Sequence, residues 1–567
     1  MKRLDWIILW TSIAVVLLAG LPFRRYIRSV KDYLLAGRTQ PWYLLAPSCQ
    51  AVQCDVGDFF GAASFIYQHG LFGLTYWIVA QPFGWLLGAN ITIPYLYRSG
   101  VWTPAEWLEI RFNAPARLWG ALLIVLQRIF VMGNMILGTA LLFKVLVGSP
   151  MIWGVGVAIF LGSLYVLFGG VAATVTVGTA QLILMSVGAW AMLIVAWSKT
   201  GGLPAVAAQF PQYLHVATQP SFPQLLPGLA VLGSLFSVGG YPVYQAEQTS
   251  RPLSARTEHD ARLGYLFAGP VCYIHQGAIL ITGLFGLLIY GAANSSLVPR
   301  DILYPLMMVK FLPSGLLGIV AASVMAATIS TVAANAQSCA GMVTRDIYGR
   351  LLYRKGSEDH YMRVSRVLTA LWFLLGAALV PIISKGGMAN TYVKVTGAYV
   401  TPLMPTMLLS VLYRRASRWA GFGAMILGGT FGTFVTVIPI IKLGIWGHFL
   451  AFPAVNFAFS ALAFLFISEL ENALRGTRPR SEWEGRVMGT FPENLRQYAD
   501  IEDAIRRRAY VEADSQGVID SALAKGGVVL KAGKPIYGSS GIPWYKQVWF
   551  WSIVVGVIEV LTVIFLW

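Results

Sequence analysis

The sequence predicts an all-α integral membrane protein with about fourteen transmembrane helices. Of its 567 residues, 56% are hydrophobic and only 12% are charged, a composition that excludes a string of soluble domains. The hydrophobic residues lie in runs of about 17–25 residues, the length that crosses roughly 30 Å of hydrocarbon. The expected helices cover 5–23, 42–66, 73–97, 118–146, 151–168, 174–197, 226–246, 262–292, 314–344, 365–384, 390–412, 417–440, 446–468 and 546–566.

The basic residues indicate which loops face the cytoplasm. If the N-terminus is outside, the inward segments hold 32 of the 42 Lys and Arg residues; they are 24–40, 98–117, 251–262, 345–366, 413–418 and 475–546. The positive-inside rule therefore predicts a cell-membrane protein, taken as one of a bacterial inner membrane, with both termini outside. The net charge of +17 then reflects attraction to the lipid bilayer's anionic inner leaflet, and nucleic acid is not expected as a partner. The first run lacks a cleavage site and is expected to be a retained helix.

Two of the expected helices are interrupted by glycine and proline. The second contains Pro47, Gly57 and Gly61, and the seventh contains Gly239 and Pro242. A pair of broken helices at corresponding positions is the best sequence indication of a transporter's binding site. Because five helices begin at each, the sequence predicts two inverted five-helix repeats. The expected division is a leading helix at 1–24, the repeats at 25–200 and 201–415, trailing helices at 416–470, a cytoplasmic segment at 471–545 and a last helix at 546–567.

Charged residues within these spans are few, and intramembrane charges are usually functional because their burial is costly. Asp55 and Asp58 are three residues apart, so on a helix they would share a face. They would repel unless a cation, a proton or Arg128 joined them. The sequence therefore predicts an ion or substrate site near residue 55. The alternative is an ion pair between Arg128 and either aspartate that only fixes helix packing.

Other polar groups give weaker indications. Ser330 and Thr331, in the ninth span, can offer oxygen to a hard cation, although such hydroxyls commonly bond to the carbonyl four residues earlier. Glu247 is interpreted as a solvated residue at a helix end, and His275 as a hydrogen-bonded core histidine. The four cysteines show no metal or disulfide pattern. No catalytic constellation or cofactor fingerprint is present, so neither enzyme activity nor an organic cofactor is expected.

Several motifs, in their order and spacing, resemble the sodium:solute symporter family. They are DYLLAGR (32–38), EIRFN (109–113), FGG followed by Gln181 (168–181), SRPLSA (250–255), ATISTVAANAQS (327–338), TRDIYGR (344–350), and TGAYVTP followed by YRRAS (396–417). The resemblance covers about residues 32–430. It implies a LeuT-type fold with one leading and three trailing helices around a ten-helix core. It also implies sodium-coupled import of a small solute by alternating access.

The resemblance further implies a sodium site made of five oxygen atoms. Three are the carbonyls of Ala51, Cys54 and Ala327, and two are the hydroxyls of Ser330 and Thr331. An unwound helix frees carbonyls, and such neutral oxygens suit a small hard cation.

This sequence departs from the family at one ion-related position. Many relatives carry a Trp-Thr-Asp triplet where Thr176-Val177-Gly178 stand here, so a second sodium is not expected. Asp55 could supply the missing charge. Alternatively, Asp55 or Asp58 takes up a proton, which would make the chain a proton-coupled transporter.

The solute site is expected between the two broken helices. The family includes a bacterial galactose symporter. Its sugar-contacting positions correspond here to Gln53, Asp58, Trp77, Met132 and Val238. The last three are apolar, which argues against a sugar as the solute.

A small carboxylate or zwitterion is predicted instead. Arg128 would hold the acid by paired hydrogen bonds, and Asp55 or Asp58 would hold any amine. Tyr241 corresponds to a position near the tyrosine of the family's inner gate. The alternative is that Tyr241 is only an aromatic packing residue. A remaining alternative is a non-transporting sensor that signals through 475–545.

Overall fold

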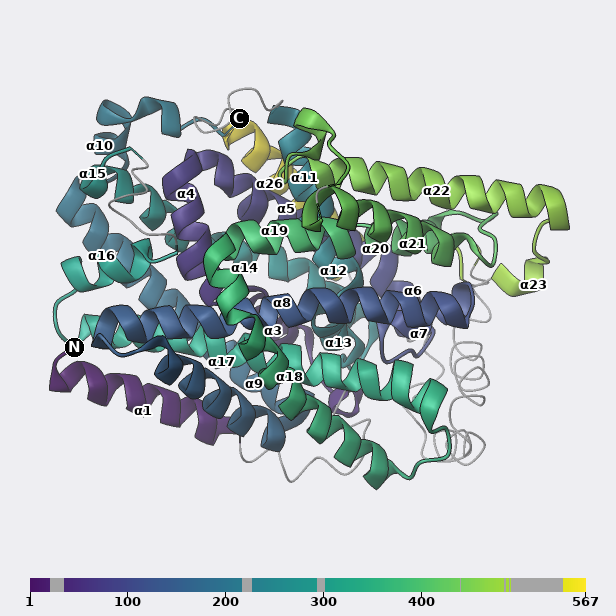
Figure 1. Ribbon diagram of the computed structural model, residues 1–567, viewed down its shortest axis with the longest axis horizontal. Coiled ribbons are helices and arrows are strands. Elements are labelled where there is room, and N and C mark those ends of the chain that lie inside the picture. The colour runs from purple at the N-terminus through teal and green to yellow at the C-terminus, as the bar shows by residue number, and fades with distance from the viewer. Residues whose placement is uncertain are drawn as a thin grey trace.

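The computed structural model consists of helices packed side by side, which confirms the all-α prediction (Figure 1). It describes residues 1–20, 35–216, 227–292, 301–438, 440–483, 486–488, 490 and 544–566. Within these ranges no strand is present, and Gln40 and Ala255 form an isolated bridge. The long helices run in a common direction, with α10, α15 and α16 at one end of the molecule and α7 and α23 at the other.

Seven helices in the described ranges are long and apolar enough to cross a membrane, or eight if a bent pair counts as one span. The expected number of about fourteen is therefore not confirmed by length and composition. The longer helices are α1 (Arg3–Gly20), α8 (Ala114–Val147), α9 (Met151–Thr200), α14 (Glu258–Leu284), α17 (Leu316–Met342), α18 (Glu358–Gly386), α21 (Ala420–Gly432), α22 (Phe452–Arg475) and α26 (Val548–Leu566).

Helix breaks explain much of the difference in number, because they divide expected spans into short pieces. Residues 42–98 form α3 (Trp42–Gln53), η3 (Asp58–Ala62), α4 (Ala63–His69), η4 (Gly70–Gly73), η5 (Thr75–Val79), α5 (Ala80–Leu87), η6 (Gly88–Thr92) and α6 (Ile93–Arg98). The expected seventh span forms α11 (Pro227–Ser237), η8 (Val238–Gly240), α12 (Tyr241–Tyr244) and α13 (Ala246–Leu253). Both helices that the sequence predicts to be interrupted are therefore broken.

The remaining elements are short helices, among which α19 and α20 form the bent pair. They are η2 (Ala36–Arg38), α7 (Pro104–Arg111), α10 (Gly202–Gln209), η7 (Pro211–Tyr213), α15 (Gly286–Tyr290), α16 (Leu303–Phe311), η9 (Val343–Leu352), α19 (Met388–Tyr399), α20 (Leu403–Leu412), η10 (Thr433–Val437), η11 (Gly444–Gly447), α23 (Arg480–Trp483) and η13 (Trp544–Lys546). The sequence separates 151–168 from 174–197, whereas α9 covers both ranges; neither proline nor a charged residue lies between them to end the helix.

The centre of the molecule is formed by α3, α8, α9, α14 and α17. Helix α17 packs against α9, α8 and α3, while α3 also packs against α14. Glycines allow the closest approach between elements. A Cβ atom on Gly84 in α5 would overlap the carbonyl oxygen of Gly239 in η8, so the broken seventh span can lie directly against α5 only because both residues are glycine.

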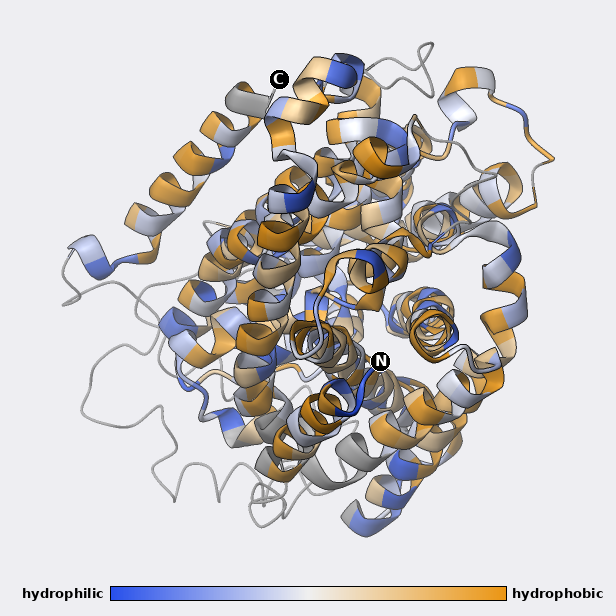
Figure 2. Ribbon diagram, turned by 90° about the vertical axis from the view of Figure 1, so that its left-hand side faces the viewer, coloured by the Kyte–Doolittle hydropathy of each residue, from blue (hydrophilic) through white to orange (hydrophobic). Residues whose placement is uncertain are grey.

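The outer surface has the character of a surface that contacts lipid. Large apolar side chains such as Trp153, Ile382, Phe466 and Ile564 are exposed on outer helices, and hydrophobic residues predominate along the helices in Figure 2. Together with the long apolar helices, this distribution identifies a multi-pass membrane protein. Most of the expected cytoplasmic segment 471–545 lies outside the described residues.

Candidate functional site

The break in the second span places two aspartates at the start of a new helical segment. Helix α3 ends at Gln53, and Cys54 has an extended backbone. The Asp55 carboxylate accepts a hydrogen bond from the Gly57 amide (2.5 Å), and the Asp58 carboxylate accepts one from the Asp55 amide (2.9 Å). This reciprocal arrangement is a capping box, which satisfies amides that a helix start leaves without partners. The two carboxylates therefore lie close together at the break, as the sequence predicts.

The oxygen atoms of the expected sodium site also come together. The Thr331 hydroxyl lies 3.1 Å from the Cys54 carbonyl oxygen and 3.5 Å from that of Ala51. The Ser330 hydroxyl lies 3.3 Å from the Ala51 carbonyl oxygen and 2.9 Å from that of Ala327. Thr331 lies 3.0 Å from the same Ala327 oxygen, its own i−4 carbonyl. All five oxygens thus meet between the break after α3 and helix α17.

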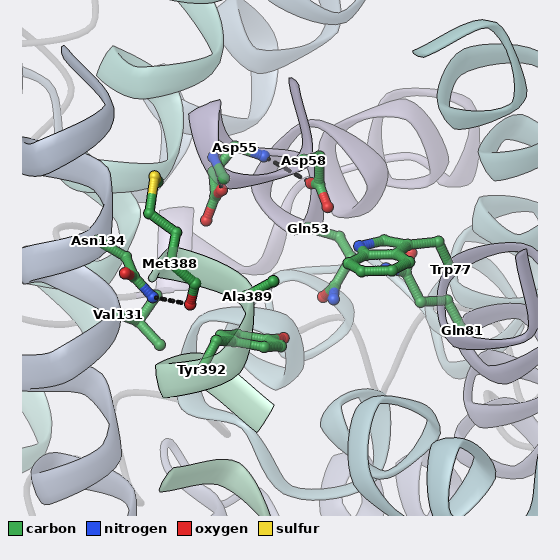
Figure 3. A pocket seen from close by; sticks show the side chains of 11 residues that line it. Gln53, Asp55, Asp58, Trp77, Gln81, Val131, Asn134, Met388, Ala389 and Tyr392 are labelled. Carbon is green, nitrogen blue, oxygen red and sulfur yellow. Dashed lines mark hydrogen bonds between the residues drawn. The ribbon is translucent and has the colours of Figure 1, made fainter. Parts of the chain in front are cut away.

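A partly open cavity of about 40 Å³ adjoins the aspartates, with room for a few water molecules. Its polar lining consists of Gln53, Asp55, Asp58, Gln81 and Asn134, and its aromatic lining of Trp77 and Tyr392. Figure 3 shows these side chains around a common space, with the aspartates on one side and Tyr392 on the other. Gly57, Val131, Met388 and Ala389 complete the lining. The cavity lies between the broken second span, α5, α8 and α19.

The partner of Arg128 differs from either aspartate. Its guanidinium forms a salt bridge with Glu247 in α13 and donates a hydrogen bond to Gln245 (3.0 Å). Glu247 is almost fully buried, so its interpretation as a solvated residue is wrong. The broken seventh span turns this side chain inward. Arg128 also lies over the ring of Tyr241, 4.9 Å from its centroid.

Tyr241 belongs to a hydrogen-bond network just beyond the cavity. Its hydroxyl is bonded to Gln127 and lies 3.0 Å from the Thr396 hydroxyl, and its ring stacks on Tyr392, with centroids 5.9 Å apart. Gln127 accepts a hydrogen bond from Gln245 (3.2 Å). Neither Tyr241 nor Arg128 lines the cavity. Instead, Tyr241 packs against Tyr392, which does line the cavity, and Arg128 packs against Tyr241.

The structure therefore divides the expected solute residues into two groups. Gln53, Asp55, Asp58 and Trp77 line the cavity. Arg128 and Tyr241 do not line it, and neither do Met132 and Val238, the apolar residues at the relative's sugar-contacting positions.

Sequence reasoning missed several residues of this site. An amide within an apolar span, such as Asn134, was a detectable signal, whereas Tyr392 and Met388 had none. His275 is hydrogen-bonded on both nitrogens, to Ser186 (3.1 Å) and to the Cys54 sulfur (2.9 Å). These contacts are consistent with the interpretation of His275 as a hydrogen-bonded core histidine. His275 also contacts Cys54, whose carbonyl belongs to the oxygen cluster.

Comparisons with known proteins agree with the geometry. The model of the sodium:solute symporter family matches residues 33–428. The sodium/glucose cotransporter of Vibrio parahaemolyticus is 24% identical over 444 residues, which cover 73% of this chain and 80% of that protein. Sodium/glucose cotransporter 1 of Mus musculus is 23% identical over 507 residues, which cover 78% of this chain and 74% of that protein.

A solved structure with a similar fold is the substrate-bound, outward-open state of a sodium-coupled sialic acid symporter. Its TM-score is 0.68 at 18% identity, and the match covers 83% of this chain and 98% of that one. At this identity the likeness concerns the fold, which is the LeuT type that the sequence predicts.

Proposed function

Because this chain belongs to the sodium:solute symporter family, we propose that it imports a small polar solute together with sodium by alternating access. The observation that carries the proposal is the meeting of five oxygen atoms, from Ala51, Cys54, Ala327, Ser330 and Thr331, at the break after α3. The adjoining cavity supplies a place for the solute beside the ion.

The chemistry of the oxygen cluster suits sodium. Two of its carbonyls are available because the helix is interrupted there. Each hydroxyl oxygen keeps lone pairs for a cation while it donates its proton to a carbonyl of the same cluster. A sodium ion that crosses the membrane inward releases about 2.3 kcal/mol per 100 mV of potential. This free energy drives solute uptake without covalent chemistry or an organic cofactor.

The proposed orientation follows the basic residues. Both termini lie outside the cell membrane, and α7, η9 and α23 lie on the cytoplasmic side. The repeats correspond to 25–200 and 201–415, and the broken spans that begin each repeat bring α3 and α13 together. Pairing of the two broken spans at the centre of the molecule supports this division.

A zwitterion is the solute that best combines the sequence and the structure. Its amine would bind at Asp55 and Asp58, and its acid would need a hydrogen-bond donor. Arg128 could serve only if its guanidinium left Glu247. The side-chain amides of Gln53 and Gln81 already line the cavity and offer donors without such a rearrangement.

Thermal unfolding of the purified protein in detergent tests sodium binding without knowledge of the solute. A ligand that binds the folded state raises the unfolding temperature in proportion to the logarithm of its concentration over its Kd. Sodium, compared with potassium at equal ionic strength, should raise it for the wild type. The variant Ser330→Ala should lose most of this increase, because one oxygen of the cluster is gone.

Ser323→Ala is the matched control, since Ser323 lies two turns earlier in α17 and donates to the Val320 carbonyl (2.7 Å) outside the cluster. It should keep the wild-type response to sodium. Equal responses of the two variants would place sodium elsewhere and contradict the proposed site. A panel of amino acids, carboxylates, sugars and nucleobases added with sodium then identifies the solute.

A further inference from the structure

The charges around the cavity point to a solute that carries a positive charge. We propose that the cavity binds the ammonium or other cationic group of a small organic solute between Asp55, Asp58, Trp77 and Tyr392. This inference rests on the proposed transport function and narrows its solute class. It excludes simple carboxylates and neutral sugars as the preferred solute.

The first observation is an excess of negative charge. Asp55 and Asp58 both line the cavity, and no Lys, Arg or His is among the lining residues, all of which are described. Among the described residues, neither aspartate takes part in a salt bridge. Asp55 accepts a hydrogen bond from the Gly57 amide, and Asp58 accepts one from the Asp55 amide. Arg128 is close enough to Asp55 to interact electrostatically. Its charge is nevertheless balanced by Glu247, with which it pairs directly.

The balance of charges therefore leaves two carboxylates to be neutralised. One sodium in the oxygen cluster at Cys54 would compensate one of them. The second, when it carries no proton, would stay uncompensated, which is unfavourable in this site. A cationic group of the solute placed beside the aspartates, such as the ammonium of a zwitterion, removes this cost, and an anionic group placed there increases it. Solute and sodium would then stabilise each other's binding through the shared carboxylates.

A second, independent observation is an acceptor without a partner. The Oδ1 atom of Asn134 is buried and makes no hydrogen bond within the described part of the chain, and the residue is only 5% exposed. Its amide nitrogen is oriented toward the Met388 carbonyl (3.4 Å). The side chain lines the same cavity, on the side of Val131 and Met388 (Figure 3). An N–H group of a cationic solute can satisfy this oxygen.

The third observation is aromatic lining. Trp77 and Tyr392 both border the cavity, and the face of an aromatic ring attracts a cation within about 6 Å. Tyr392 is held in place by its stacking on Tyr241. Carboxylates, an amide oxygen and two aromatic rings together form a site for an organic cation.

Charged thiol reagents measure this selectivity without knowledge of the solute. Ala389 lines the cavity beside Tyr392, and Ala389→Cys places a small thiol there. Two methanethiosulfonates of similar size are compared, one with a trimethylammonium group and one with a sulfonate group. Ala207→Cys on the exposed side of α10 gives the rate ratio of the two reagents outside the cavity. The four native cysteines are buried, and wild-type protein gives their background.

The ratio of cationic to anionic labelling at Ala389→Cys should exceed the ratio at Ala207→Cys about tenfold or more, because the two reagents differ in the sign of their charge. Adding Asp55→Asn and Asp58→Asn should return it to the ratio of the exposed site. An equal or lower ratio would overturn the proposal, as would absence of labelling by either reagent. If the ratio is high but sodium changes neither labelling nor stability, the cation site stands and sodium coupling fails.

Discussion

Arg128 in α8 and Glu247 in α13 form a salt bridge in which the two side chains are only 5% and 2% exposed. The pair joins α8 to the broken seventh span. Arg128 lies over the ring of Tyr241, and that ring stacks on Tyr392. A buried pair of this kind contributes little net stability, but removing one partner leaves an uncompensated charge. A substitution of either residue alone should therefore destabilise the protein more than a substitution of both.

Glu247→Gln should destabilise the protein by about 3–5 kcal/mol, because the Arg128 charge stays buried without its partner. The double variant Arg128→Gln with Glu247→Gln should be more stable than the single variant, since no net charge then remains there. Thermal unfolding in detergent measures both. A single variant as stable as the wild type would show that the pair is not buried in the folded protein.

A second buried network at the proposed cytoplasmic end should behave similarly. Arg117 pairs with Glu106, Glu109 and Asp346, and its side chain is 1% exposed. Arg117→Ala should cost about 3–5 kcal/mol of stability.

The matched control is Arg415→Ala, since Arg415 pairs with Glu469 while their side chains are 58% and 44% exposed. This change should cost no more than about 1 kcal/mol. Comparable losses in the two variants would contradict the burial of the Arg117 network.

Asp55→Asn distinguishes sodium coupling from proton coupling. Asparagine can still accept the hydrogen bond from Gly57, so the helix cap and the fold should persist. In a sodium-coupled carrier the variant should lose sodium affinity, measured as a weaker stabilisation by sodium, and uptake should keep its dependence on sodium. Loss of the pH dependence of uptake, with an unchanged response to sodium, would instead support the proton-coupled alternative.

The beginning of the expected cytoplasmic segment is predicted to detach in acid. Glu482 in α23 bonds to Arg418 (2.5 Å) and Arg478 (2.9 Å), and the Arg418 hydrogen bond holds the pKa of Glu482 below its ordinary value. A lowered pKa means that the contact stabilises docking fully above the ordinary value of about 4.3, and that this stabilisation is lost as pH falls from there through the lowered pKa.

A nitroxide label at Met488→Cys should report this release. Met488 donates a backbone hydrogen bond to Val411 (2.8 Å), so its label should be less mobile at pH 7 than at a pH about two units below the ordinary value of Glu482. Adding Glu482→Gln should raise the mobility at pH 7. A label at Leu474→Cys, an exposed position in α22, should change little. Equal mobility of the Met488 label at both pH values would contradict the role of Glu482.

The sequence predicts the class of the protein and the two broken helices, for a local reason. Long apolar runs and their interruption by glycine and proline depend on neighbouring residues only, and the break near residue 55 lies where the pattern indicates. The capping box of Asp55 and Asp58 is likewise local, since it joins residues three apart. The five expected oxygen ligands meet as well, although their role as sodium ligands stays a proposal.

Tertiary structure decided which distant residues meet. Arg128 and Glu247 are separated by more than a hundred residues, so no local pattern could show that the guanidinium pairs with Glu247 and not with either aspartate. The same holds for Asn134 and Tyr392, which reach the cavity from α8 and α19. The sequence by itself determined a membrane transporter with broken helices; the folding of those helices against one another decided the charge of the cavity, and with it the solute that we propose.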